Sequence, residues 1–336
     1  MANYSFALDA YDYLKQFFSK SQIFILMYHR VTPIRDSWTL ESLSPLNFER
    51  QIIYLQRHYK IISLEHLVES MAKGICLPKK TAVITFDDGY KDNYYYAYPI
   101  LKNYCIPATF FLSTGHIGTG NLFWWDKIGY AIQHTDLDQL DLDGIGAHSL
   151  RSADERKMAI LRITERLKKV PSEKMNSLLK DLLAIACPEI PIDLGKKLIM
   201  SWDDVREMSC DGFAFGAHTA NHPILTNMPL EQVEFEILQS KKDIEEKIGQ
   251  KVTAFSYPGG CFDEDIVGLV QKSSFKCAVD GGRNRRVNPT DNVYRLARIA
   301  TVENFNISKV ILSGLMSDLY SGKCRIKAIG DRYGSS

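Results

Sequence analysis

Continuous apolar runs alternate with amphipathic segments along the first third of the chain. Residues 22–31 (QIFILMYHRV) form a run without polar alternation, which is typical of a strand buried on both faces. Residues 81–86 and 107–113 have the same character, and the segments at 44–59 and 90–104 carry apolar residues at helical spacing. This strand–helix–strand order predicts a parallel sheet.

The alternation stops after residue 115 and returns near residue 200. The interval contains a long charged helical segment at 152–170, so we expect a mainly helical insertion. Beyond it, further strands and helices are predicted, the strands at 213–218, 253–258, 276–281 and 294–301 and the helices at 230–249 and 264–273. The predicted organisation is a short N-terminal helix (1–21), one α/β domain (22–115 and 200–312), the insertion (116–199) and a C-terminal tail (313–336).

Composition narrows the class of protein. Among 336 residues, 45% are hydrophobic and 24% are charged, which is typical of a soluble globular protein. The formal charge of +1 gives no electrostatic reason to expect nucleic acid or an anionic membrane as partner. The apolar run at 23–28 is too short to span a bilayer and makes a poor secretory signal. Seven scattered cysteines without a CxxC pair favour a reducing compartment, and we expect a cytoplasmic protein.

The sequence TFDDG places two carboxylates side by side at the end of a predicted strand. Asp87 and Asp88 should repel each other, and a bound cation is the simplest way to offset that repulsion. The segment GAHTANHP follows another predicted strand and offers His218 and His222, which can face one ion from a single helical turn. Alone, a DDG is more often a turn and an HxxxH a pair of ordinary loop histidines. The carboxyl ends of parallel strands share one face, which favours a common site.

The motifs TFDDG, HTANH and FSYPGG, in this order, resemble those of the polysaccharide deacetylase family, the NodB-homology carbohydrate esterases of family 4. The resemblance covers residues 23–115 and about 200–300. It implies a distorted (β/α) barrel that holds a divalent metal, most commonly zinc. It also implies that Asp88, His218 and His222 are the metal ligands and that Asp87 is the general base acting on water.

The third motif departs from the family pattern because it lacks an arginine before the proline. The resemblance implies that the backbone N–H of Gly259 binds the oxyanion, and a backbone donor survives this side-chain change. Tyr257 is predicted in the wall of the substrate groove, although an aromatic residue beside a strand end is also accounted for by packing.

The family's late acidic histidine is missing, because no histidine follows His222. His29, at the end of the first predicted strand, resembles the acid of a permuted branch that includes biofilm poly-N-acetylglucosamine deacetylases. We therefore expect His29 to be the general acid; the alternative is a core histidine satisfied by backbone.

Arg298 resembles an arginine that tethers the base aspartate, and strand alternation predicts that Arg295 points to the opposite face. Asp280 is interpreted as a turn former before two glycines. In FWWD at residues 123–126, Trp125 is predicted to contact sugar and Asp126 can bind hydroxyls, although packing of the insertion accounts for the same residues.

Together these observations predict a metal-dependent hydrolase that removes an N-acyl group, most simply N-acetyl, from an amino sugar of a polysaccharide or glycan precursor. Two alternatives remain open: an O-acetyl carbohydrate esterase and a barrel that binds carbohydrate without catalysis. Acetyl and formyl groups both fit the prediction, and the pattern does not specify an oligomeric state.

Overall fold

The structure is a computed structural model that describes residues 22–33, 42–186, 189–282, 285–304 and 306. The predicted N-terminal helix at 1–21 and the tail at 313–336 lie outside these residues. No helix in the described part of the chain combines the length and the apolar character needed to cross a membrane.

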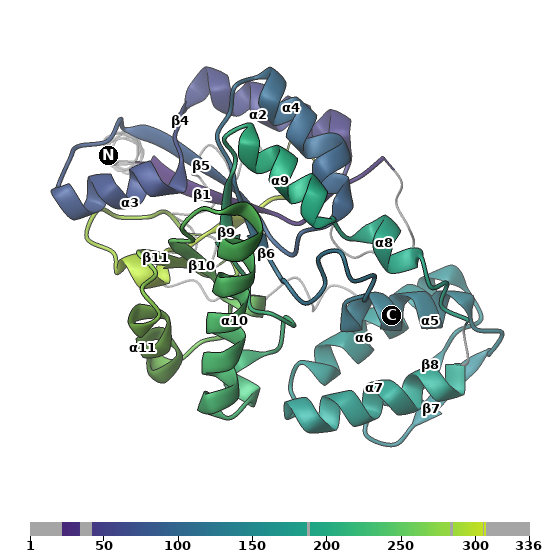
Figure 1. Ribbon diagram of the computed structural model, residues 1–336. Helices are drawn as coiled ribbons and strands as arrows, with labels where there is room; N and C mark the ends of the chain where they lie inside the picture. The colour runs from purple at the N-terminus through teal and green to yellow at the C-terminus, as the bar shows by residue number, and fades with distance from the viewer. Residues whose placement is uncertain (1–21, 34–41, 187–188, 283–284, 305, 307–336) are drawn as a thin grey trace, which may run out of the picture.

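A curled parallel sheet forms the centre of the molecule (Figure 1). Its main path runs β11-β10-β9-β6-β5-β1-β12, and a short strand, β4, pairs with β5. The bounds of the strands are β1 Gln22–Tyr28, β4 Lys60–Ile61, β5 Lys80–Phe86, β6 Thr109–Leu112, β9 Ala214–Ala217, β10 Ala254–Ser256, β11 Cys277–Val279 and β12 Ile299–Ala300. A parallel bridge between Val279 and Leu296 joins β11 to the segment that enters β12, so one stretch of chain spans the gap between the edge strands. The predicted α/β barrel is thereby confirmed.

Helices surround this sheet because alternate strand residues face them. Phe24, Leu26 and Tyr28 of β1 pack in the large core that the outer helices cover, whereas Ile23 and Ile25 belong to a second apolar cluster that also contains helix residues 64, 67 and 68. The helices around the barrel are α2 Pro45–His58, α3 Leu64–Lys73, α4 Tyr98–Asn103, α9 Trp202–Cys210, α10 Leu230–Ile248 and α11 Glu264–Lys272, with a π-helical turn at Asn93–Ala97 preceding α4.

The segment between the two halves of the barrel has a core of its own. It contains α5 Trp124–His134, a hairpin of β7 Gln139–Leu142 and β8 Gly146–Ser149, α6 Ala153–Leu167, α7 Ser172–Ala186 and α8 Leu194–Leu198. Buried residues of α5, α6 and α7 form one apolar cluster separate from that of the barrel. Figure 1 shows these helices to one side of the sheet. The domain boundaries drawn from sequence stay a prediction.

The structure differs from the sequence-based expectations at several places. The strand expected at 294–301 is reduced to Ile299–Ala300, because Val293–Arg295 form a 3-10 turn that carries the chain across the barrel edge. Strand alternation therefore does not separate Arg295 from Arg298, although the two do diverge: Arg295 pairs with exposed Glu264, and Arg298 is fully buried. Helix α3 and the β7–β8 hairpin had no counterpart in the predicted elements, and the helical turn expected at His218–His222 is a loop.

Candidate metal and catalytic site

The two aspartates occupy a tight turn at the end of β5. The N–H of Asp87 donates to the carbonyl of Tyr28 on the neighbouring strand, which extends the parallel ladder by one residue. Asp88 then takes a left-handed backbone with φ 75°, and Gly89 follows at φ 86°. The left-handed backbone at Gly89 favours glycine, because any residue with a Cβ is strained at this φ. This turn directs both carboxylates to one end of the barrel.

The two histidines are presented by a loop after β9. Thr219 and His222 have φ values of 64° and 53°, and a positive φ is a genuine outlier for a β-branched residue such as threonine. The Thr219 hydroxyl donates to the carbonyl of His218 and accepts from the N–H of His222 at 3.0 Å. Thr219 therefore fixes the backbone of both histidines, which replaces the expected helical turn.

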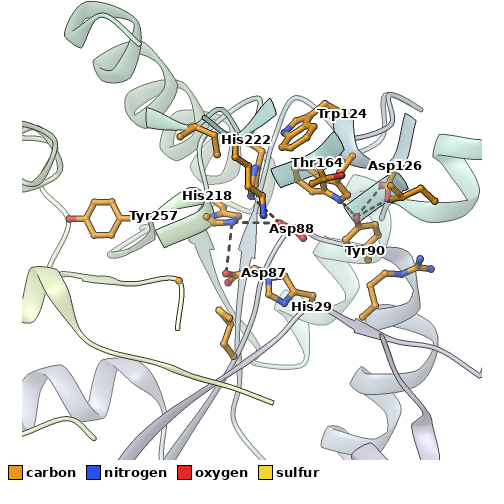
Figure 2. A pocket seen from close by; sticks show the side chains of 18 residues that line it. His29, Asp87, Asp88, Tyr90, Trp124, Asp126, Thr164, His218, His222 and Tyr257 are labelled. Carbon is orange, nitrogen blue, oxygen red and sulfur yellow. Dashed lines mark hydrogen bonds and ion pairs between the residues drawn. The ribbon is translucent and has the colours of Figure 1, made fainter. Parts of the chain in front are cut away.

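Asp88, His218 and His222 form a buried group that can hold a metal ion. Asp88 Oδ1 lies 3.5 Å from His218 Nε2 and 3.4 Å from His222 Nε2. Figure 2 shows the two imidazoles directed toward Asp88. Ligand atoms each about 2.1 Å from a tetrahedral zinc stand about 3.4 Å apart, so these separations fit such an ion. Asp88 Oδ1 is also buried without a hydrogen-bond partner among the described residues, as expected of a ligand atom.

The protonation of the group suits metal binding. Burial opposes ionisation of Asp88, but the two histidines outweigh it and lower the pKa of this carboxyl. Burial, reinforced by His218, lowers the pKa of His222 to about 3, so its imidazole is neutral. His218 Nδ1 faces the carbonyl of Ser256 at 2.8 Å and donates to it, so Nε2 is the ring nitrogen directed toward Asp88.

Asp87 lies beside this group but is held by a different partner. The Arg298 guanidinium donates from Nη1 to Oδ1 at 2.7 Å and from Nη2 to Oδ2 at 2.5 Å, a bidentate pair. Burial raises the pKa of Asp87, but Arg298 and then His218 outweigh burial and hold it well below the ordinary range. Asp87 is thus an ionised carboxylate next to the metal group and 3.8 Å from His218 Nε2.

Arg298 is itself positioned by the turn after β11. Asp280 accepts the N–H of Arg298 at 3.0 Å through its carboxylate and receives the guanidinium Nε–H on its carbonyl. The same carboxylate accepts the N–H of Gly282, so the predicted turn role is observed together with this contact to Arg298. Ser256 adds a hydroxyl that accepts from Arg298 Nη2 at 2.9 Å.

A cavity of about 270 Å³ opens over the metal group. His29 and Gly259 line it together with Asp87 and Asp88. His29 is half-buried directly after β1, and Figure 2 shows its ring beside the two aspartates. Gly259 has φ 59°, and among the described residues its N–H has no hydrogen-bond partner, whereas those of Gly260 and Cys261 donate to carbonyls in the same turn.

The two predicted sugar-contacting residues differ in what they can offer. Tyr257 is fully buried and donates its hydroxyl to the carbonyl of Tyr294. Its phenol therefore points away from the metal group, as Figure 2 shows. Trp125 is half-buried at the cavity, stacks on Phe123 at 4.5 Å and meets the edge of His222 at 4.5 Å. Both line the cavity, and their contact with substrate stays a prediction.

Sequence reasoning missed Thr219, Ser256 and Tyr90. Thr219 lies inside the HTANH motif, and Ser256 directly precedes the tyrosine of FSYPGG, so position within the motifs was an available signal. Their roles depend on backbone carbonyls and on a left-handed residue, which no residue pattern encodes. Tyr90 binds Asp126 of the insertion, a contact between distant segments.

The barrel, the triad that can hold a metal ion and the tethered carboxylate together define a (β/α)-barrel protein with the parts of a metal-dependent hydrolytic site. The sequence profile of the family described as polysaccharide deacetylase matches residues 74–278, more than half of the chain. The protein belongs to the polysaccharide deacetylase family, as the motifs indicated.

Named relatives agree with this assignment, and solved structures share the fold. The poly-beta-1,6-N-acetyl-D-glucosamine N-deacetylase of Staphylococcus aureus is 43% identical over 88 residues, which is 26% of this chain and 30% of the relative. The fold resembles the Streptococcus pyogenes deacetylase PplD in complex with acetate (TM-score 0.59, 19% identity, covering 89% of this chain and 99% of that one). It also resembles IcaB from Ammonifex degensii (TM-score 0.57, 18% identity, covering 87% and 97%).

Proposed function

We propose that this protein is a metal-dependent N-deacetylase that hydrolyses the N-acetyl group of an amino sugar within a glycan. The observation that carries the proposal is the pairing of Asp87 with Arg298 beside the Asp88–His218–His222 group. If Asp87 were only a further ligand of the ion, it would not need an arginine partner. If Asp87 and Arg298 formed only a structural ion pair, they would not need to lie beside the Asp88–His218–His222 group. Their combination supplies a base next to a metal site.

The ligand set of one carboxylate and two imidazoles suits zinc, which we propose as the ion. A bound zinc ion activates water and polarises the amide carbonyl of the substrate. The chain's own residues carry out the remaining tasks. Asp87 accepts the proton of the attacking water. Its Oδ2 accepts hydrogen bonds from both Arg298 and the Ser256 hydroxyl, whereas Oδ1 retains a lone pair beyond the one that Arg298 occupies.

The other two tasks fall to groups that line the same cavity. The N–H of Gly259 faces no protein acceptor in the described chain and can donate to the developing oxyanion. His29, which reaches the cavity from the end of β1, is proposed to protonate the departing amine. His29 and Arg298 lie outside residues 74–278, so their roles do not rest on the family match. The role of His29 rests on its position at the cavity, and that of Arg298 on its two hydrogen bonds to Asp87.

The substrate class follows from the relatives and the cavity together. The staphylococcal relatives are named for an N-acetylglucosamine polymer, but the match spans less than half of their length. The cavity opens to the surface beside the metal group, so a sugar unit within a longer glycan can approach it. We therefore propose an N-acetylated glycan as substrate.

Asp87→Asn tests the proposed base. The amide keeps the shape of the side chain but cannot accept the proton, so we expect kcat on N-acetylated glucosamine oligomers to fall by about 10²- to 10⁴-fold. Zinc content, measured by elemental analysis, should remain that of the wild type, since Asp87 is not a ligand. Asp141→Asn, an exposed aspartate in the hairpin, is the control. Turnover at the wild-type rate in Asp87→Asn would contradict the proposal.

A further inference from the structure

The cavity over the metal group continues onto the helical insertion. Its lining includes Trp124 and Asp126 from α5, and Ile160 and Thr164 from α6. Figure 2 shows Trp124, Thr164 and Asp126 on the side of the metal group opposite Tyr257. A reacting N-acetyl group needs only the barrel end of this cavity, so the insertion wall is available for another part of the substrate.

Several polar groups at this end of the cavity lack hydrogen-bond partners in the described part of the chain. The indole Nε1 of Trp124, the hydroxyl of Thr164 and Nη1 of Arg30 are all buried, and none has a hydrogen-bond partner among the described residues. The three side chains are at least nine-tenths buried, with 8%, 4% and 8% exposure. A buried donor left unpaired costs about 1–3 kcal/mol, so two on the insertion and one on the facing barrel segment point to a ligand that supplies the missing partners.

Asp126 adds a carboxyl group that can accept a further hydrogen bond. Both of its oxygens lie within hydrogen-bond distance of the Tyr90 hydroxyl, at 3.2 and 3.0 Å, but that hydroxyl has a single proton to give. The Tyr90 oxygen in turn accepts from Trp125 Nε1 at 2.8 Å, which orients its proton toward Asp126. Burial raises the pKa of Asp126 to about 7, against the effect of Arg30. One carboxyl oxygen therefore remains for a ligand.

The wall is held in place against the barrel. Asn227, in the turn that follows the second histidine, donates to the carbonyls of Lys168 and Val170 at the end of α6. Ser172, at the start of α7, donates to the carbonyl of Asn227 in return. At the other side, Tyr90 and Asp126 join the turn after β5 to α5. The insertion is thus fastened to both segments that carry metal ligands.

We propose that the insertion, together with Arg30 of the barrel, forms a second sugar subsite, in which Trp124, Thr164, Asp126 and Arg30 bind hydroxyl groups of the sugar unit adjoining the one that is deacetylated. This inference rests on the proposed function. The two basic side chains that line this end of the cavity, Arg30 and Lys168, each pair with a carboxylate, so charge selects neither an anion nor a cation. Hydroxyls both donate and accept, which matches the mixed set, and Ile160 offers an apolar surface for the ring.

The proposal is tested by comparing a monosaccharide with an oligosaccharide. The probes are N-acetylglucosamine and its β-1,6- and β-1,4-linked pentamers, assayed by acetate release. Wild-type protein should have a kcat/KM for at least one pentamer that is about tenfold or more above that of the monosaccharide, since the second unit adds several hydrogen bonds. Equal values for the monosaccharide and both pentamers would overturn the proposal.

Thr164→Val removes the hydroxyl at nearly constant volume. We expect it to lower the ratio of kcat/KM for the preferred pentamer over the monosaccharide by about three- to tenfold, and Asp126→Asn to do the same. Thr164→Ser restores the hydroxyl and should restore the ratio. Ile163→Val is the matched control, because Ile163 is the preceding residue of α6, packs in the insertion core and does not line the cavity. An unchanged ratio in Thr164→Val and Asp126→Asn would overturn the proposal.

A binding measurement separates this inference from the proposed function. If the wild-type protein releases acetate from none of the probes, the N-deacetylase proposal fails, and calorimetric titration with the pentamers decides the subsite. Pentamer binding that weakens in Thr164→Val but not in Ile163→Val would support the sugar subsite even though the protein does not catalyse N-deacetylation. Absence of pentamer binding in the wild type would overturn it.

Discussion

Arg298 is a buried cation whose partner is the proposed base. Its guanidinium has no exposed surface, and both oxygens of Asp87 are bound to it. Arg298→Met would leave Asp87 buried beside the metal ligands without this partner. Removing one member of a buried ion pair costs about 3–5 kcal/mol, so we expect a loss of that order in the free energy of unfolding, measured by urea denaturation.

The double variant Arg298→Met/Asp87→Asn distinguishes loss of packing from an uncompensated charge. It has no unpaired carboxylate, so its stability should exceed that of Arg298→Met alone, giving a favourable coupling energy in the double-mutant cycle. Additive effects of the two substitutions would show that the ion pair is not what makes Arg298 necessary.

Thr219 is expected to act on metal affinity through the two histidines. Its hydroxyl bridges the backbone of His218 and His222, and it holds a backbone conformation that threonine rarely adopts. Thr219→Val keeps the β-branched shape and loses both hydrogen bonds. Loss of a partner that orients ligands typically costs about 10- to 100-fold in metal affinity, to be measured by competition with a chromophoric chelator. Thr219→Ser should retain wild-type affinity, and equal affinity in the valine variant would contradict this role.

At the scale of elements, two glycine turns meet at the barrel end and set the position of Gly259. A Cβ on Gly281 would lie 2.5 Å from the backbone N of Gly260, a contact that the chain can relieve only by moving one of the turns. Gly281→Ala should therefore reduce both stability and deacetylation, with kcat affected because the Gly259 N–H moves with its turn.

Gly268→Ala provides the matched control for this substitution. Gly268 lies within α11, where a Cβ would meet nothing within 4 Å. Alanine there should raise the free energy of unfolding by about 0.5–1 kcal/mol, because it favours the helix, and leave kcat unchanged. If Gly281→Ala behaved like this control in thermal melts and acetate-release assays, the contact between the turns would have no bearing on the oxyanion donor.

The sequence predicts an element well where the local residue pattern determines it and poorly where contacts between distant segments or an unusual backbone conformation determine it. The buried strands were predictable because a short continuous apolar run between turn residues is typical of a strand covered on both faces, and the Asp pair and the histidines follow such runs directly. The loop from His218 to His222 was not, since its shape comes from two positive φ values that a hydroxyl stabilises. The length of the strand at 294–301 was overestimated. Leu296 and Ile299 are both buried but pair with different edges of the barrel, and from the sequence alone two apolar residues so close together are typical of one strand.

At the scale of the molecule, the sequence indicated that an insertion exists but not what it touches. The contacts that join it to the barrel, Tyr90 with Asp126 and Asn227 with the end of α6, connect positions 36 or more residues apart. No sequence motif indicates either contact, because each depends on how the insertion packs against the barrel. The same holds for the orphan polar groups of Trp124 and Thr164, which are noticeable only once burial is known.

Metal binding should stabilise the whole chain, because the three ligands come from two segments, the β5 turn and the loop after β9, that unfolding separates. A ligand at 100 times its Kd raises the free energy of unfolding by about 2.7 kcal/mol if it binds the folded state alone. We therefore expect Tm, measured by calorimetry under reducing conditions, to fall when a chelator strips the protein and to recover on addition of zinc. Binding of zinc to the seven cysteines of the unfolded chain would reduce the size of this effect. Asp88→Ala lacks the carboxylate ligand, so its Tm should respond little to chelator or zinc. A zinc-dependent rise in Tm of equal size in the wild type and in Asp88→Ala would show that the ion binds elsewhere.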